Sequence, residues 1–329
     1  MGIPMLGERD WFILQLLADG HFHSGTALGK ALGISRAAIC QHIKQIRECG
    51  LRINAVSGRG YCLEKRLELL DEKMIGTCLS SAMQSRIALL RVLPEVDSTN
   101  SWLQRQSGSR QGLQVCLAEL QSSGKGRRGR VWHSPPAANL YLSIATFLPQ
   151  SVLAKGGLSL AVAVAISRVL EHAGLDRIGI KWPNDVLVGG KKIAGVLVEA
   201  AGELHGDARV IIGVGLNVAM PESVTLELDQ PWTDLSREGR PLSRNQLAVM
   251  LLQELIVMLD DYTADFGQQW LDAWRKWDLT YDQPVLLSLS DKQLTGIARG
   301  IDSHGLLMLE HDGQIHSYAS GDVSLRLQA

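Results

Sequence analysis

The spacing of hydrophobic and polar positions predicts two helices joined by a tight turn between residues 22 and 50. Ser24 and Ser35 each precede a stretch with helical spacing, as N-cap residues do, and Gly33 lies between the two stretches. In the second stretch apolar positions recur at i, i+4 and i+7, which places them on one face of a helix. These positions are Ile39, Ile43 and Ile46.

Residues 51–63 alternate between apolar and polar types and contain Gly58-Arg59-Gly60. This pattern predicts a β-hairpin with Arg59 at its tip, so that residues 1–66 form a winged helix-turn-helix. Its polar side chains can contact phosphates and base edges. The residues expected to bind DNA are Ser35, Arg36, Gln41, Lys44, Gln45 and Arg59. The alternative is a small helical protein-interaction domain whose charges are solvated.

The middle of the chain combines strand-like and helix-like stretches, which predicts an α/β or α+β domain. Residues 113–120 ("LQVCLAEL"), 180–200 ("IKWPNDVLVGGKKIAGVLVEA") and 210–220 ("VIIGVGLNVAM") read as strands joined by turns. The most apolar stretch, residues 158–166 ("LSLAVAVAI"), is too short to cross a bilayer and is typical of a buried helix.

The last part of the chain, residues 284–327, has the pattern of short alternating strands. We expect turns at residues 290–291, 303–305 and 312–313, which suit a small SH3-like barrel. No group of catalytic type stands out there. Residues interpreted as surface positions are His304, His311, His316 and Arg326.

Charge and cysteine content narrow the class of protein. The net charge is −1, but residues 1–66 hold nine Lys and Arg against five Asp and Glu, which indicates a polyanionic partner for that end. Residues 64–73 ("EKRLELLDEK") read as a charged connector, with a domain boundary near residue 66. The five cysteines contain no C-x-x-C pair, and the N-terminus lacks a signal-peptide pattern. We therefore expect a reducing cytoplasm and no membrane partner.

A basic glycine-rich stretch, residues 121–130 ("QSSGKGRRGR"), contains a literal G-x-G-x-x-G. A dinucleotide fingerprint needs a helix directly after the glycines and an acidic residue about 20 positions on. Pro135 and Pro136 prevent that helix, and residues 121–170 contain no Asp or Glu. The remaining interpretation is a loop whose backbone N–H groups and arginines hold an anion. Its alternative is a nucleic-acid patch or a solvated run of charge.

Two lysines, Lys181 and Lys192, lie within strand-like residues, where lysine is rare without a partner. They are candidates for holding phosphate, and the alternative for Lys181 is an ion pair with Asp185. In addition, "DSTN" (97–100) places small polar side chains at the start of a predicted helix.

Taken together, these motifs resemble the family of bifunctional biotin–protein ligases and biotin operon repressors (the BirA family). The motifs are "DSTN", "GKGRRGR", "KWPND" and "KKIAGVLVE", behind a "SRAAI" winged helix. One departure is Lys125, where family members usually have Arg. The resemblance implies a DNA-binding domain over residues 1–66, a mixed-sheet ligase domain over 67–280 and an SH3-like domain over 281–329.

The resemblance also implies two reactions. The carboxylate of biotin attacks the α-phosphate of ATP, with Mg²⁺, to give biotinyl-5'-AMP, and a lysine of the biotin carboxyl carrier protein of acetyl-CoA carboxylase then attacks that anhydride. Biotinyl-5'-AMP is further expected to favour a homodimer that binds operator DNA and represses the biotin operon. Positioned cations, without a covalent protein nucleophile, suit this chemistry.

The resemblance assigns roles to individual residues. Arg127 and Lys192 are expected to act on the carboxylate and α-phosphate, with Lys181 added as a further phosphate cation. Asp185 and Asn184 are candidates for holding Mg²⁺ or meeting the incoming lysine. The expected biotin and adenylate contacts are Ser98, Thr99, Asn100, Gln121, Lys125, Gly126, Arg127, Trp132, Lys192, Gly195 and Asn217. Trp132 is expected to cover the adenylate and Trp232 the adenine, the alternative for each being an ordinary core or surface aromatic.

Two other functions compete with this one. A ligand-sensing transcription factor without ligase activity needs a pocket but no paired lysines around a phosphate. A lipoate–protein ligase shares the activation chemistry but needs an apolar tunnel. The polar set formed by Ser98, Asn100 and Gln121 favours biotin.

Overall fold

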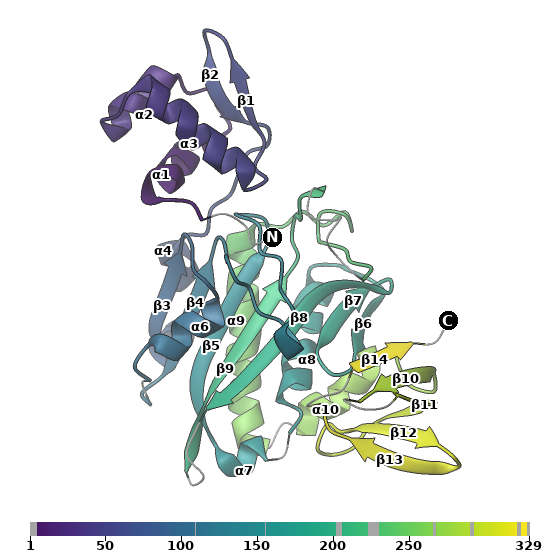
Figure 1. The fold of residues 1–329 in the computed structure, drawn as a ribbon. Helices are drawn as coiled ribbons and strands as arrows, with labels where there is room; N and C mark the ends of the chain where they lie inside the picture. Colours follow the sequence, from purple (N-terminus) through teal and green to yellow (C-terminus); the bar gives the residue numbers. More distant parts are fainter. Residues whose placement is uncertain are drawn as a thin grey trace.

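The computed structural model describes residues 5–108, 110–154, 156–201, 206–222, 230–265, 268–289, 293–320 and 324–327. Three parts follow one another along the chain: a small helical part, a central part built on a large sheet, and a small C-terminal sheet (Figure 1). No described helix is both long and apolar enough to cross a membrane.

The N-terminal part is the predicted winged helix-turn-helix. Ser24 and Ser35 cap α2 and α3 by accepting hydrogen bonds from Ala27 N (3.0 Å) and Ala38 N (3.2 Å), and Gly33 ends α2 with φ of 66°. The isoleucine stripe of α3 is buried, as predicted. The elements are α1 (Glu8–Leu17), α2 (Gly25–Leu32), α3 (Arg36–Glu48), β1 (Ile53–Val56) and β2 (Gly60–Leu63).

The central part contains a seven-stranded sheet with the order β3-β4-β5-β9-β8-β7-β6. Only the β3–β4 pair is parallel, so the sheet is mixed. The strands predicted within residues 113–120, 180–200 and 210–220 are confirmed, whereas β3 was not predicted. The strands are β3 (Ile87–Leu93), β4 (Leu113–Ala118), β5 (Leu140–Pro149), β6 (Ile178–Lys181), β7 (Asp185–Val188), β8 (Lys191–Ala201) and β9 (Asp207–Leu216).

Helices cover both faces of this sheet (Figure 1). Val115 and Leu117 of β4 belong to the main core with α8 and α9, whereas Cys116 between them packs with Leu103 of α6, because successive strand residues point to opposite faces. The predicted buried helix is α8, whose apolar residues are almost all buried. The helices are α4 (Glu72–Cys78), α5 (Ser81–Arg86), α6 (Thr99–Arg105), α7 (Gln150–Leu153), α8 (Leu158–His172), α9 (Arg244–Asp265) and α10 (Gln268–Trp274).

The C-terminal part is a five-stranded antiparallel sheet with the order β13-β12-β11-β10-β14. The turns predicted at 303–305 and 312–313 are present, whereas the one at 290–291 lies outside the described residues. Trp182 fixes this sheet to the central part, since its buried indole N–H donates to Gly305 O at 3.1 Å. The strands are β10 (Pro284–Ser288), β11 (Gln293–Ile301), β12 (Leu307–His311), β13 (Gln314–Tyr318) and β14 (Ser324–Leu327).

The charged connector after residue 63 is anchored along its length to the central part. Glu68 accepts hydrogen bonds from Arg244 N (2.7 Å) and Asn245 Nδ2 (2.9 Å), and Leu70 is buried in the main core. Burial opposes ionisation of Glu68, but its hydrogen-bond donors outweigh this and hold its pKa below the usual range. The connector therefore fixes the two parts to each other.

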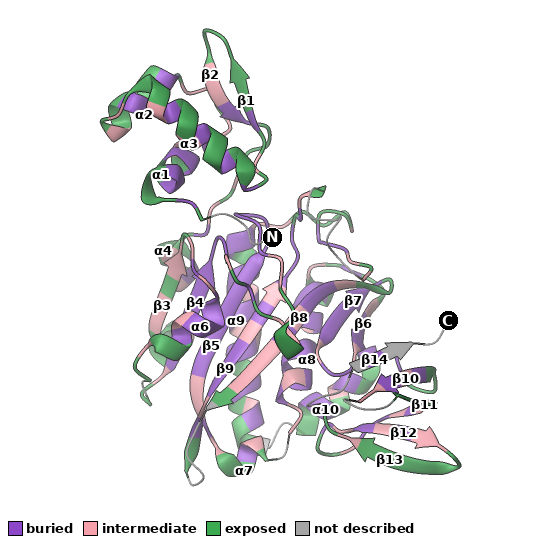
Figure 2. Ribbon diagram, in the orientation of Figure 1, coloured by how far each residue is buried: buried purple, intermediate pink, exposed green. Residues whose placement is uncertain are grey.

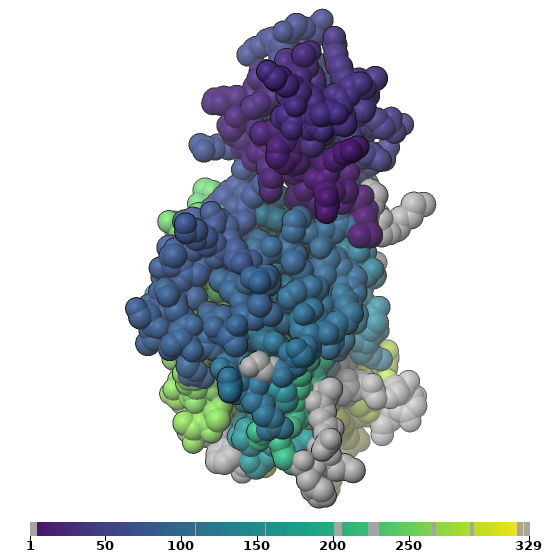
Figure 3. All heavy atoms as spheres, turned by 90° about the vertical axis from the view of Figure 1, so that its left-hand side faces the viewer, coloured from purple at the N-terminus to yellow at the C-terminus, as the bar shows by residue number. Residues whose placement is uncertain are grey.

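The N-terminal and central parts also share side chains. Leu120, which follows β4, is fully buried in the hydrophobic core of the winged helix. Leu6 N donates to Glu95 Oε2 at 2.7 Å across the same boundary. Figure 3 shows the atoms of the two parts in contact there. As a result, the residues just after β4 contact the N-terminal part as well as the central part.

Candidate active site

One cavity of about 170 Å³ lies over β8 and β9, between the start of α6, the basic loop and the turn before β7. All the residues predicted to bind biotin, adenylate or metal line it, together with Trp232. They are Ser98, Thr99, Asn100, Gln121, Lys125, Gly126, Arg127, Trp132, Lys181, Asn184, Asp185, Lys192, Gly195 and Asn217. These residues come from five separate segments, so only the fold brings them together.

At one end of the cavity, buried neutral side chains hold one another in place. Gln121 Oε1 accepts a hydrogen bond from Thr99 N at 2.9 Å, and Gln121 Nε2 donates to Ser134 Oγ at 2.9 Å. Because both contacts are made, the amide of Gln121 has one orientation. Its second N–H is then available to an acceptor in the cavity.

Asn100, expected to contact biotin, is already engaged with protein groups. Its Nδ2 donates to Glu199 Oε2 at 2.7 Å, and its Oδ1 lies 2.6 Å from Ser143 Oγ. A Cβ on Gly213 would lie 2.4 Å from that Oδ1, so β9 needs glycine there. Sequence reasoning missed Ser143 and Glu199, although each is a polar residue within an otherwise apolar strand, which was the available signal.

The opposite end of the cavity is formed by the basic loop. Lys125, Arg128 and Arg130 are exposed, while Arg127 turns towards protein groups: Nη1 donates to Asn184 Oδ1 at 3.3 Å and Nη2 to the carbonyl of Ser320. Arg127 thus joins the loop to the segment before β14. The loop predicted here is present between β4 and β5, and β5 rather than a Rossmann helix follows the glycines.

Asp185 lies between the two predicted phosphate lysines. Its Oδ1 is 2.8 Å from Lys192 Nζ and its Oδ2 is 3.6 Å from Lys181 Nζ, and all three side chains are largely buried. The ion pair considered for Lys181 is therefore present, and Lys192 shares its partner. With both oxygens facing ammonium groups, and with Asn184 Oδ1 facing Arg127, this pair of residues is not arranged as a ready metal site, and no group of three or more potential metal-binding residues occurs among the described residues.

The indole of Trp132 lies against β8 and β9 beside Lys192, whose Nζ is 5.3 Å from the ring centre. A Cβ on Gly215 would lie 2.2 Å from Trp132 Cε2, and one on Gly195 would lie 3.0 Å from Cζ3. Glycine in β8 and β9 therefore makes room for the indole. Its N–H is buried and has no hydrogen-bond partner among the described residues, which is costly unless a ligand supplies an acceptor.

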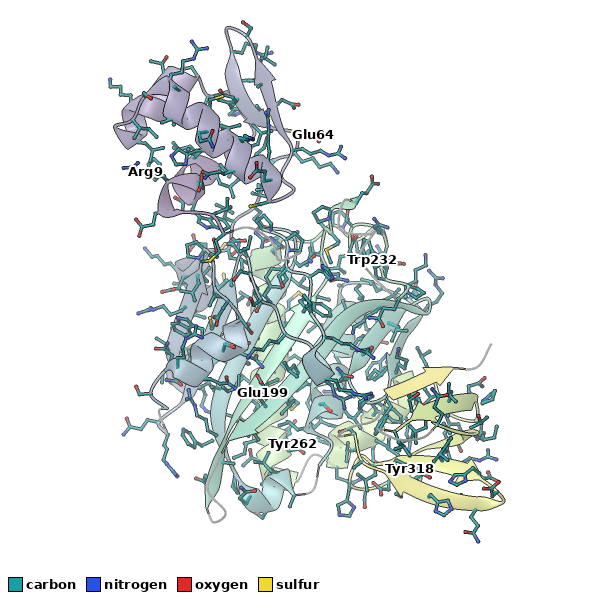
Figure 4. All side chains as sticks on the ribbon, viewed as in Figure 1. Arg9, Glu64, Glu199, Trp232, Tyr262 and Tyr318 are labelled. Atoms are coloured by element: carbon teal, nitrogen blue, oxygen red, sulfur yellow. The ribbon has the colours of Figure 1, made fainter. Side chains whose placement is uncertain are left out.

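Trp232 lies beside Lys192 in a short strand-like contact, with Lys192 N donating to Pro231 O at 3.0 Å and Thr233 N to Lys192 O at 2.9 Å. Figure 4 marks its position above the sheet. The guanidinium of Arg237 stands 4.0 Å from the centre of the ring. Sequence reasoning gave no signal for Arg237, because the contact depends on the path of this segment.

Two acidic groups near the cavity have perturbed pKa values. Hydrogen bonds from Arg105 lower the pKa of Asp97, just before Ser98. Burial raises the pKa of Asp234, although Arg237 N and Met220 N donate to it at 2.7 and 3.0 Å. Asn217, which lines the cavity just after β9, is buried. Its Oδ1 has no hydrogen-bond partner among the described residues.

The predicted DNA-binding residues form a separate exposed surface on the N-terminal part. Arg36, Gln41, Lys44 and Gln45 are exposed on α3, and Figure 2 shows exposed and buried positions alternating along this helix. At the wing tip, the guanidinium of Arg59 stacks 4.2 Å from the centre of the Phe22 ring. The wing is therefore tied back to the segment before α2.

Comparison with known proteins gives matches along nearly the whole chain. Three family models match: an HTH domain over residues 11–62, the biotin/lipoate A/B protein ligase family over 92–217, and the biotin protein ligase C terminal domain over 280–326.

Relatives and solved structures agree with these matches. The chain is 41% identical to the bifunctional ligase/repressor BirA of Salmonella typhimurium over 314 residues, covering 95% of this chain and 96% of that protein. It is 31% identical to the protein of the same name from Bacillus subtilis, covering 97% and 98%. The biotin protein ligase of Aquifex aeolicus, solved with biotin and ATP, superposes with a TM-score of 0.62 at 26% identity, covering 72% of this chain and 98% of that one.

Proposed function

Because the chain belongs to the BirA family of bifunctional ligase/repressors, we propose that it activates biotin with ATP and transfers it to a lysine of the biotin carboxyl carrier protein of acetyl-CoA carboxylase. The observation that carries this proposal is the cavity described above, in which a neutral hydrogen-bonding end lies beside a cationic end. A ureido ring fits the first and an acyl-phosphate the second.

In the first step, a carboxylate oxygen of biotin attacks the α-phosphorus of ATP. The new O–P bond forms as the bond to pyrophosphate breaks, giving biotinyl-5'-AMP. Two anions must approach each other, so cations lower the barrier most where charge accumulates, on the α-phosphoryl oxygens. Lys192, Lys181 and Arg127 supply that charge, and Asp185 holds both lysines in place before the ligand arrives.

In the second step, the amine of the carrier lysine attacks the carbonyl carbon of the anhydride and AMP leaves. The amine must be neutral to attack and must lose a proton afterwards. Asp185 is the carboxylate within the cavity that can accept it, once the lysines have moved from it to phosphate.

Mg²⁺ supplies charge neutralisation on the polyphosphate when it is bound. We propose that it arrives with ATP and keeps mostly phosphate and water ligands, as Mg²⁺ usually does. Asp185 and Asn184 are the residues within reach. Their present engagement with Lys192 and Arg127 suits a metal that the nucleotide brings, rather than one held by the protein alone.

A pyrophosphate-release assay tests the enzyme proposal. With ATP, biotin is expected to give pyrophosphate and lipoate none. Release with lipoate alone would make the protein a lipoate ligase. Release with neither would leave a ligand-sensing transcription factor.

We further propose that the winged helix-turn-helix binds the operator of the biotin biosynthetic operon as part of a homodimer stabilised by biotinyl-5'-AMP. Two copies related by a two-fold axis match the symmetry of a palindromic site. We assign residues 1–66, 67–280 and 281–329 to the three domains, and the cytoplasm as the site of action, which fits five free cysteines. Sedimentation that shows one unchanged mass with and without the adenylate would contradict the dimer.

A further inference from the structure

We propose that Glu199 is a positioning residue that makes Thr99 a hydrogen-bond acceptor towards the ligand, acting through Asn100 and Ser143. This inference rests on the proposed function, because it concerns how the neutral end of the cavity distinguishes a ureido N–H from an acceptor. Glu199 lies on β8, as marked in Figure 4, and is the last residue of the motif "KKIAGVLVE", where the sequence assigned it no role.

The first step concerns the amide of Asn100. An ionised carboxylate only accepts hydrogen bonds, so Glu199 Oε2, at 2.7 Å, selects the Nδ2 side of that amide. The Oδ1 side must then face Ser143 Oγ, at 2.6 Å. Since an amide oxygen cannot donate, the hydroxyl of Ser143 donates to Asn100.

The second step concerns the two hydroxyl protons. Thr99 Oγ1 lies 2.7 Å from Ser143 Oγ and 3.1 Å from Gln121 Oε1. Counting the contact between Asn100 and Ser143, three oxygen pairs share two protons. When Ser143 donates its hydroxyl proton to Asn100, Thr99 donates its own to Ser143. The longest contact, 3.1 Å between Thr99 Oγ1 and Gln121 Oε1, is then left without a proton. The opposite assignment would leave two oxygens 2.6 Å apart with none.

The consequence is that every hydrogen bond in the series from Thr99 through Ser143 and Asn100 is donated in the direction of Glu199. Thr99 Oγ1 then presents lone pairs to the cavity, while the second N–H of Gln121 presents a donor beside it. A ureido group carries N–H and C=O side by side and matches this pair. Lined up in one direction, the hydrogen bonds also strengthen one another.

This chain of hydrogen bonds is enclosed by protein, so water does not easily reverse the direction of its donors. The exposed fractions of Thr99, Asn100 and Ser143 are 4%, 3% and 0%. The missing side chain of Gly213 leaves room for Asn100 Oδ1 in this place. Reversal requires a neutral, two-sided group at position 199, which can donate to Asn100 and let its amide turn over.

The test compares biotin with its two cyclic carbamate analogues, in each of which one ureido N–H is replaced by oxygen. Titration calorimetry gives the ratio of Kd values, carbamate over biotin, for the full-length protein. Wild type should reject one carbamate, because its ring oxygen would face the lone pairs of Thr99. In Glu199→Gln that ratio should fall by about tenfold, the effect of one hydrogen bond reversed.

Ser143→Ala provides a second variant, since it interrupts the chain without touching the charge, and its ratio should fall in the same direction. Glu254→Gln is the matched control. It removes another half-buried paired glutamate, 3.1 Å from Arg168, and should leave the ratio unchanged. A purely structural loss would weaken both ligands equally and leave the ratio constant.

The inference is overturned if wild type binds both carbamates as tightly as biotin, or if the ratio is the same in wild type, Glu199→Gln and Ser143→Ala. Failure of the proposed function looks different. In that case wild type would neither bind biotin nor release pyrophosphate with it.

Discussion

At the end of the cavity beside α6, the polar side chains are buried and bonded to one another, whereas the basic loop at the other end exposes Lys125, Arg128 and Arg130 to solvent. The hydrogen bonds among the side chains of this neutral end are formed before a ligand arrives, and the fold depends on them. At the second end, Asp185, Asn184 and a carbonyl hold Lys192 and Arg127. Changes at the neutral end should therefore affect stability, and changes at the cationic end should affect chemistry.

Lys192→Met should give the largest effect on activity and should separate activity from stability most clearly. We expect biotin-dependent pyrophosphate release to slow by about 10²–10³-fold, as when one donor to a transition-state oxyanion is lost. The melting temperature should stay near that of wild type, because Asp185 keeps Lys181 at 3.6 Å. The control is Lys191→Met, which changes the neighbouring exposed lysine. If Lys192→Met itself released pyrophosphate at a rate within about threefold of wild type, the scatter of a surface change, Lys192 would not belong to the site.

Arg127→Gly should come next, because it cuts the loop from Asn184 and Ser320. Loss of charged hydrogen bonds of this kind should speed the escape of the adenylate by about 10–100-fold. Labelling of lysines on an added bystander protein measures that escape. Arg128→Gly removes the adjacent charge at a residue with φ of 58° and should not cause labelling. Equal labelling by both variants would contradict the role of Arg127.

Gln121→Leu tests the neutral end. It leaves Thr99 N without its acceptor and Ser134 without its donor, so the free energy of unfolding should fall by about 1–3 kcal/mol. Urea denaturation measures this loss, with the exposed Gln104→Leu on α6 as control. If stability were unchanged, the two ends of the cavity would not differ as described.

Arg237→Met should have the smallest effect. It removes the guanidinium from the face of Trp232, 4.0 Å from the ring centre, while Asp234 keeps its two backbone donors. The KM for ATP should rise by about two- to fivefold, as expected for an exposed cation–π contact, with the KM for biotin unchanged. Arg240→Met, on the same exposed turn, is the control. A rise in both KM values would indicate general loosening instead.

The same comparison explains what the sequence could predict. Capping serines, the apolar run of α8 and the clustered glycines and lysines are local signals, and the elements and cavity residues inferred from them appear together. Ser143 and Glu199 meet Asn100 only because β5 and β8 both flank β9, a pairing that no local pattern specifies. The anchored connector and Arg237 were missed for the same reason.

Leu120 and Gln121 are consecutive, yet one lies in the core beneath α3 and the other in the wall of the cavity. A single planar peptide separates them, so the two residues are joined without an intervening hinge. We therefore expect a ligand that displaces Gln121 to displace Leu120 as well, and with it the core under α3 of the same molecule.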